Sequence, residues 1–229
     1  MNEQAPDLGV LFDLDGTLVD SLPTVAAAMS RALADFGHEF APDVVLPLIG
    51  APMPALAIEL TAVSADVAEQ IYDRYLELYY DEFIETTRPL DGAEALLGRL
   101  QAAGVPLAIV TNKNEDGGRR MVKIQRWEQY FSVVVGRDTT AQAKPWPDGS
   151  LLALETLGVS AEHAAFVGDT EFDMQAGRDA ELRMRIGLLG VRTVEQLEDA
   201  GATHIAGDLD AVGTLLLEGV GGAARAEAS

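Results

Sequence analysis

The sequence predicts an α/β protein in which helices cover both faces of a parallel sheet and an all-helical segment follows the first strand. Two observations lead to this class. Short apolar runs typical of buried strands alternate with amphipathic helical stretches along most of the chain. Between residues 21 and 87, in contrast, only helical patterns are convincing. The 229 residues, 48% of them hydrophobic, are enough for a large domain with a smaller insert.

The first strand is predicted at residues 9–13, Gly-Val-Leu-Phe-Asp, an apolar run that leads into a glycine-containing turn. Two helices follow. Residues 21–36 and 64–85 carry apolar side chains at helical spacing, and each segment opens with a serine, which is typical of a helix start. These helices belong to the insert, for which we expect the boundaries 21–87.

From residue 88 onward the chain alternates between the two patterns. The expected strands are 105–110, 131–135, 164–167, 184–189 and 203–206, and the expected helices are 91–103, 115–127, 148–157, 172–180 and 193–200, before a last helix. Because such alternation is typical of a parallel sheet, we expect residues 1–20 and 88–229 to form one core domain. The segment 218–229 is rich in small residues and is expected to fray.

Composition restricts what the protein can bind. The chain has 37 acidic and 16 basic residues, and its formal net charge of −21 opposes binding to nucleic acid or to an anionic membrane. The sequence contains neither a signal peptide nor a membrane span, so we expect a cytoplasmic protein. Zero cysteines exclude thiol nucleophiles and thiolate metal sites. A well-solvated acidic surface explains the charge better than adaptation to a high-salt cell.

Polar residues close three of the predicted strands. In chain order they are Asp13 after GVLF, Thr111 with Asn112 after LAIV, and Asp169 after AAFV and a glycine. Ligands bind at the carboxyl ends of parallel strands, so we expect these side chains to share one edge of the sheet. A carboxylate at the end of a buried strand needs a metal, a cation or hydrogen bonds. This edge is therefore the candidate site.

Two aspartates in the stretch LFDLDGTLVDS suit phosphoryl transfer. Asp13 can act as a nucleophile, because a carboxylate is ionised at neutral pH without a base to activate it. Its attack on a phosphate monoester would give an aspartyl-phosphate. Asp15 could protonate the leaving oxygen and then take a proton from water, for which it must start protonated. Gly16 lets the backbone turn tightly and approach the phosphate.

A hard cation is needed to bring a carboxylate and a phosphate together. Mg²⁺ prefers oxygen ligands and fits Asp13 with Asp169, while Asp173, four residues later, could face the same site from a helix. Lys144, which Pro145 keeps extended, could neutralise both the nucleophile and the phosphate. The chain has only three lysines beside thirteen arginines, so the position of each lysine is informative.

The segments DLDGTLVDS, TN, KPWPD and GDTEFD, in this order and spacing, resemble the haloacid dehalogenase superfamily and, within it, the phosphoglycolate phosphatase-like branch. The resemblance implies a Rossmann-like three-layer core, an inserted helical cap and magnesium dependence. It also implies roles for individual residues: Asp13 as nucleophile, Asp15 as acid and base, Thr111, Asn112 and Lys144 as phosphate contacts, and Asp13, the backbone carbonyl of Asp15 and Asp169 as metal ligands with Asp173 in support.

The leading hypothesis is therefore a phosphatase for a small phosphorylated metabolite, with 2-phosphoglycolate as the first candidate and sugar phosphates next, acting as a monomer or homodimer. A phosphomutase of the β-phosphoglucomutase kind, which passes the phosphoryl group to a sugar instead of water, is the alternative. A non-catalytic binding protein with the same fold ranks third, because it would not need the complete set of motifs. Dehalogenation is disfavoured, since the dehalogenases of this superfamily use neither a second aspartate nor a metal.

Several residues are secondary candidates. Arg88 and Lys113 could contact an anionic substrate. Trp146, between two prolines, is expected to pack beside the loop that carries Lys144, with a place at the entrance to the site as the alternative. The three histidines lie far apart in the sequence and have no ligand partners at metal spacing, so we assign them no site role.

Overall fold

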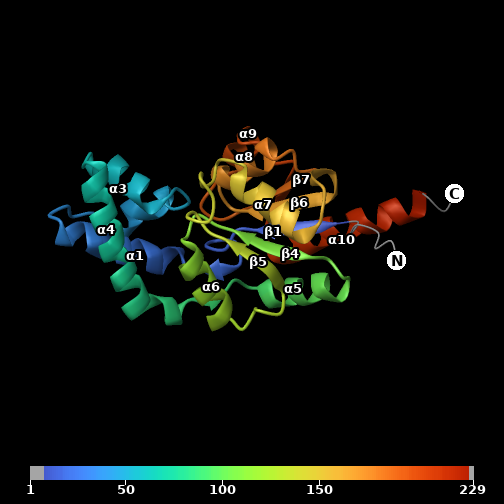
Figure 1. Ribbon diagram of the computed structural model, residues 1–229, viewed down its shortest axis with the longest axis horizontal. Helices are drawn as coiled ribbons and strands as arrows, with labels where there is room; N and C mark the ends of the chain where they lie inside the picture. The colour runs from blue at the N-terminus through green and yellow to red at the C-terminus, as the bar shows by residue number, and fades with distance from the viewer. Residues whose placement is uncertain (1–7, 227–229) are drawn as a thin grey trace. The chain divides into compact units, whose positions relative to one another are not determined.

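A six-stranded parallel sheet forms the centre of the core in the computed structural model, which describes residues 8–226 (Figure 1). The strands are ordered β5-β4-β1-β6-β7-β8 across the sheet. Their bounds are β1 Gly9–Phe12, β4 Leu107–Val110, β5 Phe131–Val135, β6 Ala164–Gly168, β7 Met184–Leu188 and β8 His204–Ala206. The predicted α/β class and parallel sheet are confirmed, and each core strand lies within two residues of its predicted position.

The three neighbouring strands β4, β1 and β6 are buried along their whole length. Each is a continuous apolar run, as expected for strands that helices cover on both faces. Phe12, the last residue of β1, pairs with Ile109 on one side and with Val167 on the other. The three strands therefore end at nearly the same level, and the residues that follow them emerge side by side.

Helices cover both faces of this sheet (Figure 1). On one side lie α7 (Asp148–Leu157), α8 (Glu171–Asp179) and α9 (Val194–Asp199), and on the other lie α5 (Ala93–Ala102), α6 (Glu115–Ile124) and α10 (Leu209–Ala226). A buried cluster between the sheet and α7 includes Leu11, Val110, Ala153, Leu154 and Phe166. Among the described helices, none is both long and apolar enough to cross a membrane.

The segment 218–229, for which we expect fraying, is helical as far as Ala226, and residues 227–229 lie outside the described part of the chain.

The chain leaves the core after Leu18 and returns at Pro89, and Val19–Arg88 form a second compact unit. This unit is helical, with α1 Leu22–Asp35, α2 Pro42–Val45, α3 Met53–Thr61 and α4 Ala65–Leu78. The predicted helix 64–85 is α-helical only to Leu78 and continues as a π-turn and a 3₁₀ turn. Two short paired strands that were not predicted, β2 (Val19–Asp20) and β3 (Arg88–Pro89), mark the entry and exit of the insert.

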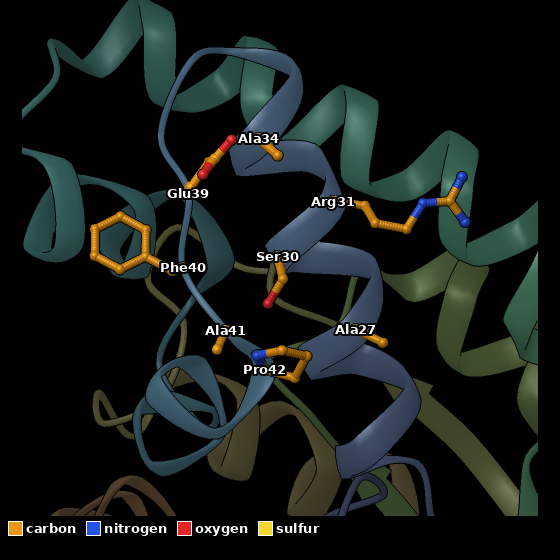
Figure 2. Close-up of a pocket in the computed structure, with 8 residues that line it drawn as sticks. All are labelled: Ala27, Ser30, Arg31, Ala34, Glu39, Phe40, Ala41 and Pro42. Atoms are coloured by element: carbon orange, nitrogen blue, oxygen red, sulfur yellow. The ribbon is translucent and has the colours of Figure 1, made fainter.

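The insert also carries an open groove of about 710 Å³ between α1 and the segment that follows it (Figure 2). Small residues of α1 and the segment 39–42 line the groove. Arg31 borders the groove and pairs with Glu82, so its charge is neutralised within the insert. None of the residues predicted to form the site lines this groove.

A close backbone approach at Gly136, just after β5, holds the start of α6 beside the sheet. A Cβ atom at this position would overlap the backbone of Asn114 and Glu115. We expect Gly136→Ala to lower the free energy of unfolding by about 3 kcal/mol, because backbone atoms cannot rotate out of the way. Denaturant unfolding measures this change.

Gly98→Ala is the matched control for that substitution. Gly98 lies within α5 with open space around it, so alanine there should stabilise the protein by about 0.5–1 kcal/mol through its higher helix propensity. Equal effects of the two substitutions on unfolding would contradict the packing described for Gly136.

Candidate active site

Three strand ends deliver the predicted site residues to one edge of the sheet. Asp13 follows β1, Thr111 follows β4 and Asp169 follows β6. All three are almost completely buried, with relative exposures of 6%, 3% and 1%. The amide N–H of Asp13 donates to the carbonyl of Val167 at 2.9 Å, which ties the end of β1 to β6. The structure thus brings together side chains that are more than 150 residues apart in the sequence.

Lys144 lies at the centre of this group. Its Nζ donates to Asp13 Oδ1 at 2.7 Å and to Asp173 Oδ1 at 2.6 Å, and the residue is only 5% exposed. Burial alone disfavours an ammonium group, but the two adjacent carboxylates outweigh this effect and raise the pKa of Lys144. Lys144 is therefore charged at neutral pH.

Asp173 is fixed by the start of α8. Its Oδ2 accepts a hydrogen bond from the backbone N–H of Thr170 at 3.0 Å, as part of a capping box, and a further one from the Thr170 hydroxyl at 2.6 Å. Because its Oδ1 accepts from Lys144, both carboxylate oxygens of Asp173 are occupied. Asp173 is thus placed to hold Lys144 and to support a metal site.

Asp169 is oriented by the turn that follows β1. Gly16 adopts a φ of 80°, a left-handed conformation that favours glycine, and the turn is closed by the N–H of Leu18 donating to the carbonyl of Leu14 at 3.0 Å. This turn directs the Thr17 hydroxyl to Asp169 Oδ1 at 2.9 Å. The Gly-Thr pair after the two aspartates therefore fixes a carboxylate that comes from another strand.

Asp15 does not join the cluster around Lys144. Its carboxylate Oδ2 lies 3.2 Å from the Nζ of Lys113, and both side chains are largely buried, at 15% and 7% exposure. The backbone of Lys113 is held on both sides, because its N–H donates to Thr111 Oγ1 at 3.2 Å and its carbonyl accepts from Arg137 N–H at 2.9 Å. The structure thus places a second lysine at the same edge of the sheet.

The remaining predicted phosphate contacts lie in the same loops. Asn112 Nδ2 donates to the backbone carbonyl of Lys144 at 3.1 Å, so the loop after β4 is joined to the loop that carries the lysine. Trp146, in the loop that carries Lys144, is 56% exposed, so more than half of its surface faces solvent.

The carboxylates of Asp13, Asp169 and Asp173 can each offer an oxygen within 4.8 Å of the others. Burial raises the pKa of Asp13 to about 7; Lys144 opposes this rise, and Asp173 adds to it. Burial and the charges of Asp13 and Asp173 likewise raise the pKa of Asp169. The single ammonium of Lys144 does not offset three buried carboxylates, and their oxygen atoms suit a hard divalent cation held by Asp13 and Asp169.

Sequence reasoning did not find every residue of this site. Thr17 and Thr170 act through hydrogen bonds to Asp169 and Asp173, and their only sequence signal is that each lies close to a predicted site aspartate. The sequence indicates Lys113 only as a secondary candidate, because no spacing rule links it to Asp15. These interactions depend on how separate loops meet in the fold.

Comparison with known proteins agrees with this fold and shows the family of the chain. Residues 10–186 match the family model described as haloacid dehalogenase-like hydrolase. A phosphoglycolate phosphatase of Aquifex aeolicus is 34% identical over 196 residues, which cover 83% of this chain and 89% of that protein. A phosphoglycolate phosphatase of Xylella fastidiosa is 35% identical over 191 residues, with 81% and 82% covered. The crystal structure of a predicted phosphatase from Clostridium acetobutylicum superposes with a TM-score of 0.85 at 27% identity, covering 92% and 98% of the two chains.

The raised pKa values of Asp13 and Asp169 predict how cation binding responds to pH. Below about pH 7 protons compete for these oxygens, so we expect the affinity for Mg²⁺ to fall about tenfold or more from about pH 8 to about pH 6. Calorimetric titration of the purified protein with Mg²⁺ measures the affinity. An affinity that is constant over this range, or that rises at the lower pH, would contradict the assignment.

Thr17→Val tests the orientation of Asp169. The substitution keeps the shape of the buried side chain but removes the hydroxyl that donates to Asp169. We expect Mg²⁺ affinity to fall about tenfold, as is typical when a residue that orients a metal ligand is lost. Thr156→Val is the control, because the exposed Thr156 hydroxyl donates to the Leu152 carbonyl within α7, away from the site. A similar loss in both variants would count against the role of Thr17.

Proposed function

We propose that this protein hydrolyses a small phosphorylated metabolite through an aspartyl-phosphate on Asp13, with Mg²⁺ as cofactor. The chain belongs to the haloacid dehalogenase-like hydrolase family and is a phosphoric monoester hydrolase. The observation that carries this proposal is the contact of Lys144 with Asp13 beside the buried Asp169. This contact supports the proposal, because a fixed positive charge beside the carboxylate favours the approach of an anionic phosphate.

In the first step an oxygen of Asp13 attacks the phosphorus, and the bond from phosphorus to the leaving oxygen breaks. Lys144 holds Asp13 in position and offsets the negative charge that approaches it. Asp15 donates its proton to the leaving oxygen, so that the product departs as a neutral alcohol. Thr111 and Asn112 contribute to binding the phosphoryl oxygens.

In the second step water attacks the phosphorus of the aspartyl-phosphate. Asp15, now ionised, accepts a proton from this water, and the bond between phosphorus and the Asp13 oxygen breaks. Inorganic phosphate is released, and both aspartates return to their initial states. A divalent cation held by Asp13, Asp169 and the backbone carbonyl of Asp15 would supply the positive charge that lets two anions meet.

The relatives support the choice of substrate. Two proteins that match more than 80% of this chain are named phosphoglycolate phosphatase, so 2-phosphoglycolate is the first candidate and sugar phosphates come next. The overall charge of −21 fits a small diffusible substrate better than a polyanion. We further propose that the protein works in the cytoplasm as a monomer or homodimer.

Phosphate release from a panel of phosphorylated metabolites, with Mg²⁺ and with chelator, tests the proposed function. We expect Mg²⁺-dependent release, strongest with 2-phosphoglycolate. Asp13→Asn should lower kcat by about a thousandfold or more, because an amide cannot act as the nucleophile. Asp116→Asn, a change of the same kind at a 64% exposed side chain of α6, should leave kcat unchanged.

Two outcomes would contradict the proposal. Turnover that persists in Asp13→Asn would show that this carboxylate is not the nucleophile. Conversion of β-glucose 1-phosphate to glucose 6-phosphate without release of free phosphate, when a trace of the bisphosphate is present, would show a phosphomutase. Both reactions share the first step and differ in whether water or a sugar accepts the phosphoryl group.

A further inference from the structure

Two of the three lysines of this chain contact aspartates at the site edge, and they contact different ones. Lys144 contacts Asp13 and Asp173, whereas Lys113 contacts Asp15. The third, Lys123, is exposed on α6. A chain that otherwise uses arginine thus places compact ammonium groups where the chemistry takes place. The mechanism given above explains Lys144 but assigns no task to Lys113.

We propose that Lys113 determines substrate specificity by binding an anionic group on the leaving part of the substrate. The preferred substrates would then be phosphate esters of small hydroxy acids, in which a carboxylate lies next to the ester carbon. This inference rests on the proposed phosphatase function and assigns to it a substrate class and the residue that selects this class.

The position of Lys113 relative to Asp15 carries the argument. Asp15 is the residue proposed to protonate the leaving oxygen, so the leaving group must lie within hydrogen-bond reach of its carboxylate. Lys113 Nζ is 3.2 Å from that carboxylate. A carboxylate one carbon away from the ester oxygen would therefore lie close to the ammonium. Lys144, which contacts the nucleophile, is placed for the transferred phosphoryl group instead.

Burial and backbone anchoring make Lys113 suitable for this role. Its side chain is only 7% exposed, and its backbone is hydrogen-bonded to Thr111 and Arg137. The ammonium is therefore held in place before substrate arrives, which lowers the entropic cost of binding. Because an ammonium group carries three N–H donors, it can contact Asp15 and a substrate carboxylate together.

The charge of the site also supports the binding of a substrate carboxylate by Lys113. Four aspartates, Asp13, Asp15, Asp169 and Asp173, face two lysines at this edge. The two lysines and a bound divalent cation would supply the positive charge at this edge, and a phosphorylated hydroxy acid brings negative charge on its carboxylate as well as on its phosphoryl group. A buried carboxylate needs a cationic or hydrogen-bonding partner. Lys113 provides such a partner on the leaving-group side.

Two substrates of the same size and a matched set of variants test the proposal. 2-Phosphoglycolate and 2-hydroxyethyl phosphate differ only in a carboxylate that is replaced by an alcohol. In Lys113→Gln we expect kcat/KM to fall for both, but at least about tenfold more for 2-phosphoglycolate, mainly through KM, as one charge-assisted hydrogen bond is lost. Lys113→Arg, which keeps the charge, should retain most of the preference.

Lys123→Gln is the control, because it removes the exposed lysine of α6 and should change neither substrate's kcat/KM. An equal loss for the two substrates in Lys113→Gln, or an unchanged preference, would overturn the specificity role. If the native protein releases phosphate from no compound of the metabolite panel, the phosphatase function fails, and calorimetric binding then decides on Lys113 separately. At least about tenfold weaker binding of 2-phosphoglycolate to Lys113→Gln would support its role, and equal affinity would refute it.

Discussion

The site depends on one buried charge cluster in which Lys144 is held between Asp13 and Asp173. An ammonium group or a carboxylate alone would be costly at this depth, and each is tolerated because the other is within hydrogen-bond distance. The cluster also constrains the fold, since β1, the loop before α7 and the start of α8 must meet for it to form. The same charges that are costly in the metal-free protein are the ones that a cation and a phosphate would stabilise.

Much of this arrangement was predictable because its signals are local. The buried strands are short apolar runs, and the polar residues that close β1, β4 and β6 meet at one edge because parallel strands share a direction. The contact of Lys113 with Asp15 was not predictable, since it depends on how the loops after β1 and β4 approach each other. The π-turn after α4 and the short strands β2 and β3 also lack a sequence period that would reveal them.

Under the proposed function, the two lysines serve different halves of the substrate. Lys144 lies beside the nucleophile and suits the phosphoryl group, whereas Lys113 lies beside the proposed acid and suits the leaving group. Phosphoryl transfer to Asp13 needs only the first of these. Discrimination among phosphate esters of similar size needs the second, because the phosphoryl group is common to all of them. The proposal thus assigns catalysis to Lys144 and specificity to Lys113, and both lysines lie at one edge of the sheet.

The central claim is that Asp13 carries the phosphoryl group during turnover. The most direct measurement is mass spectrometry of enzyme that is quenched with acid during turnover of 2-phosphoglycolate and then reduced with borohydride, which converts an aspartyl-phosphate to homoserine. Our account predicts homoserine in place of Asp13, and only when substrate and Mg²⁺ are both present. Homoserine in place of a different aspartate, or none at all in an enzyme that releases phosphate under the same conditions, would contradict it.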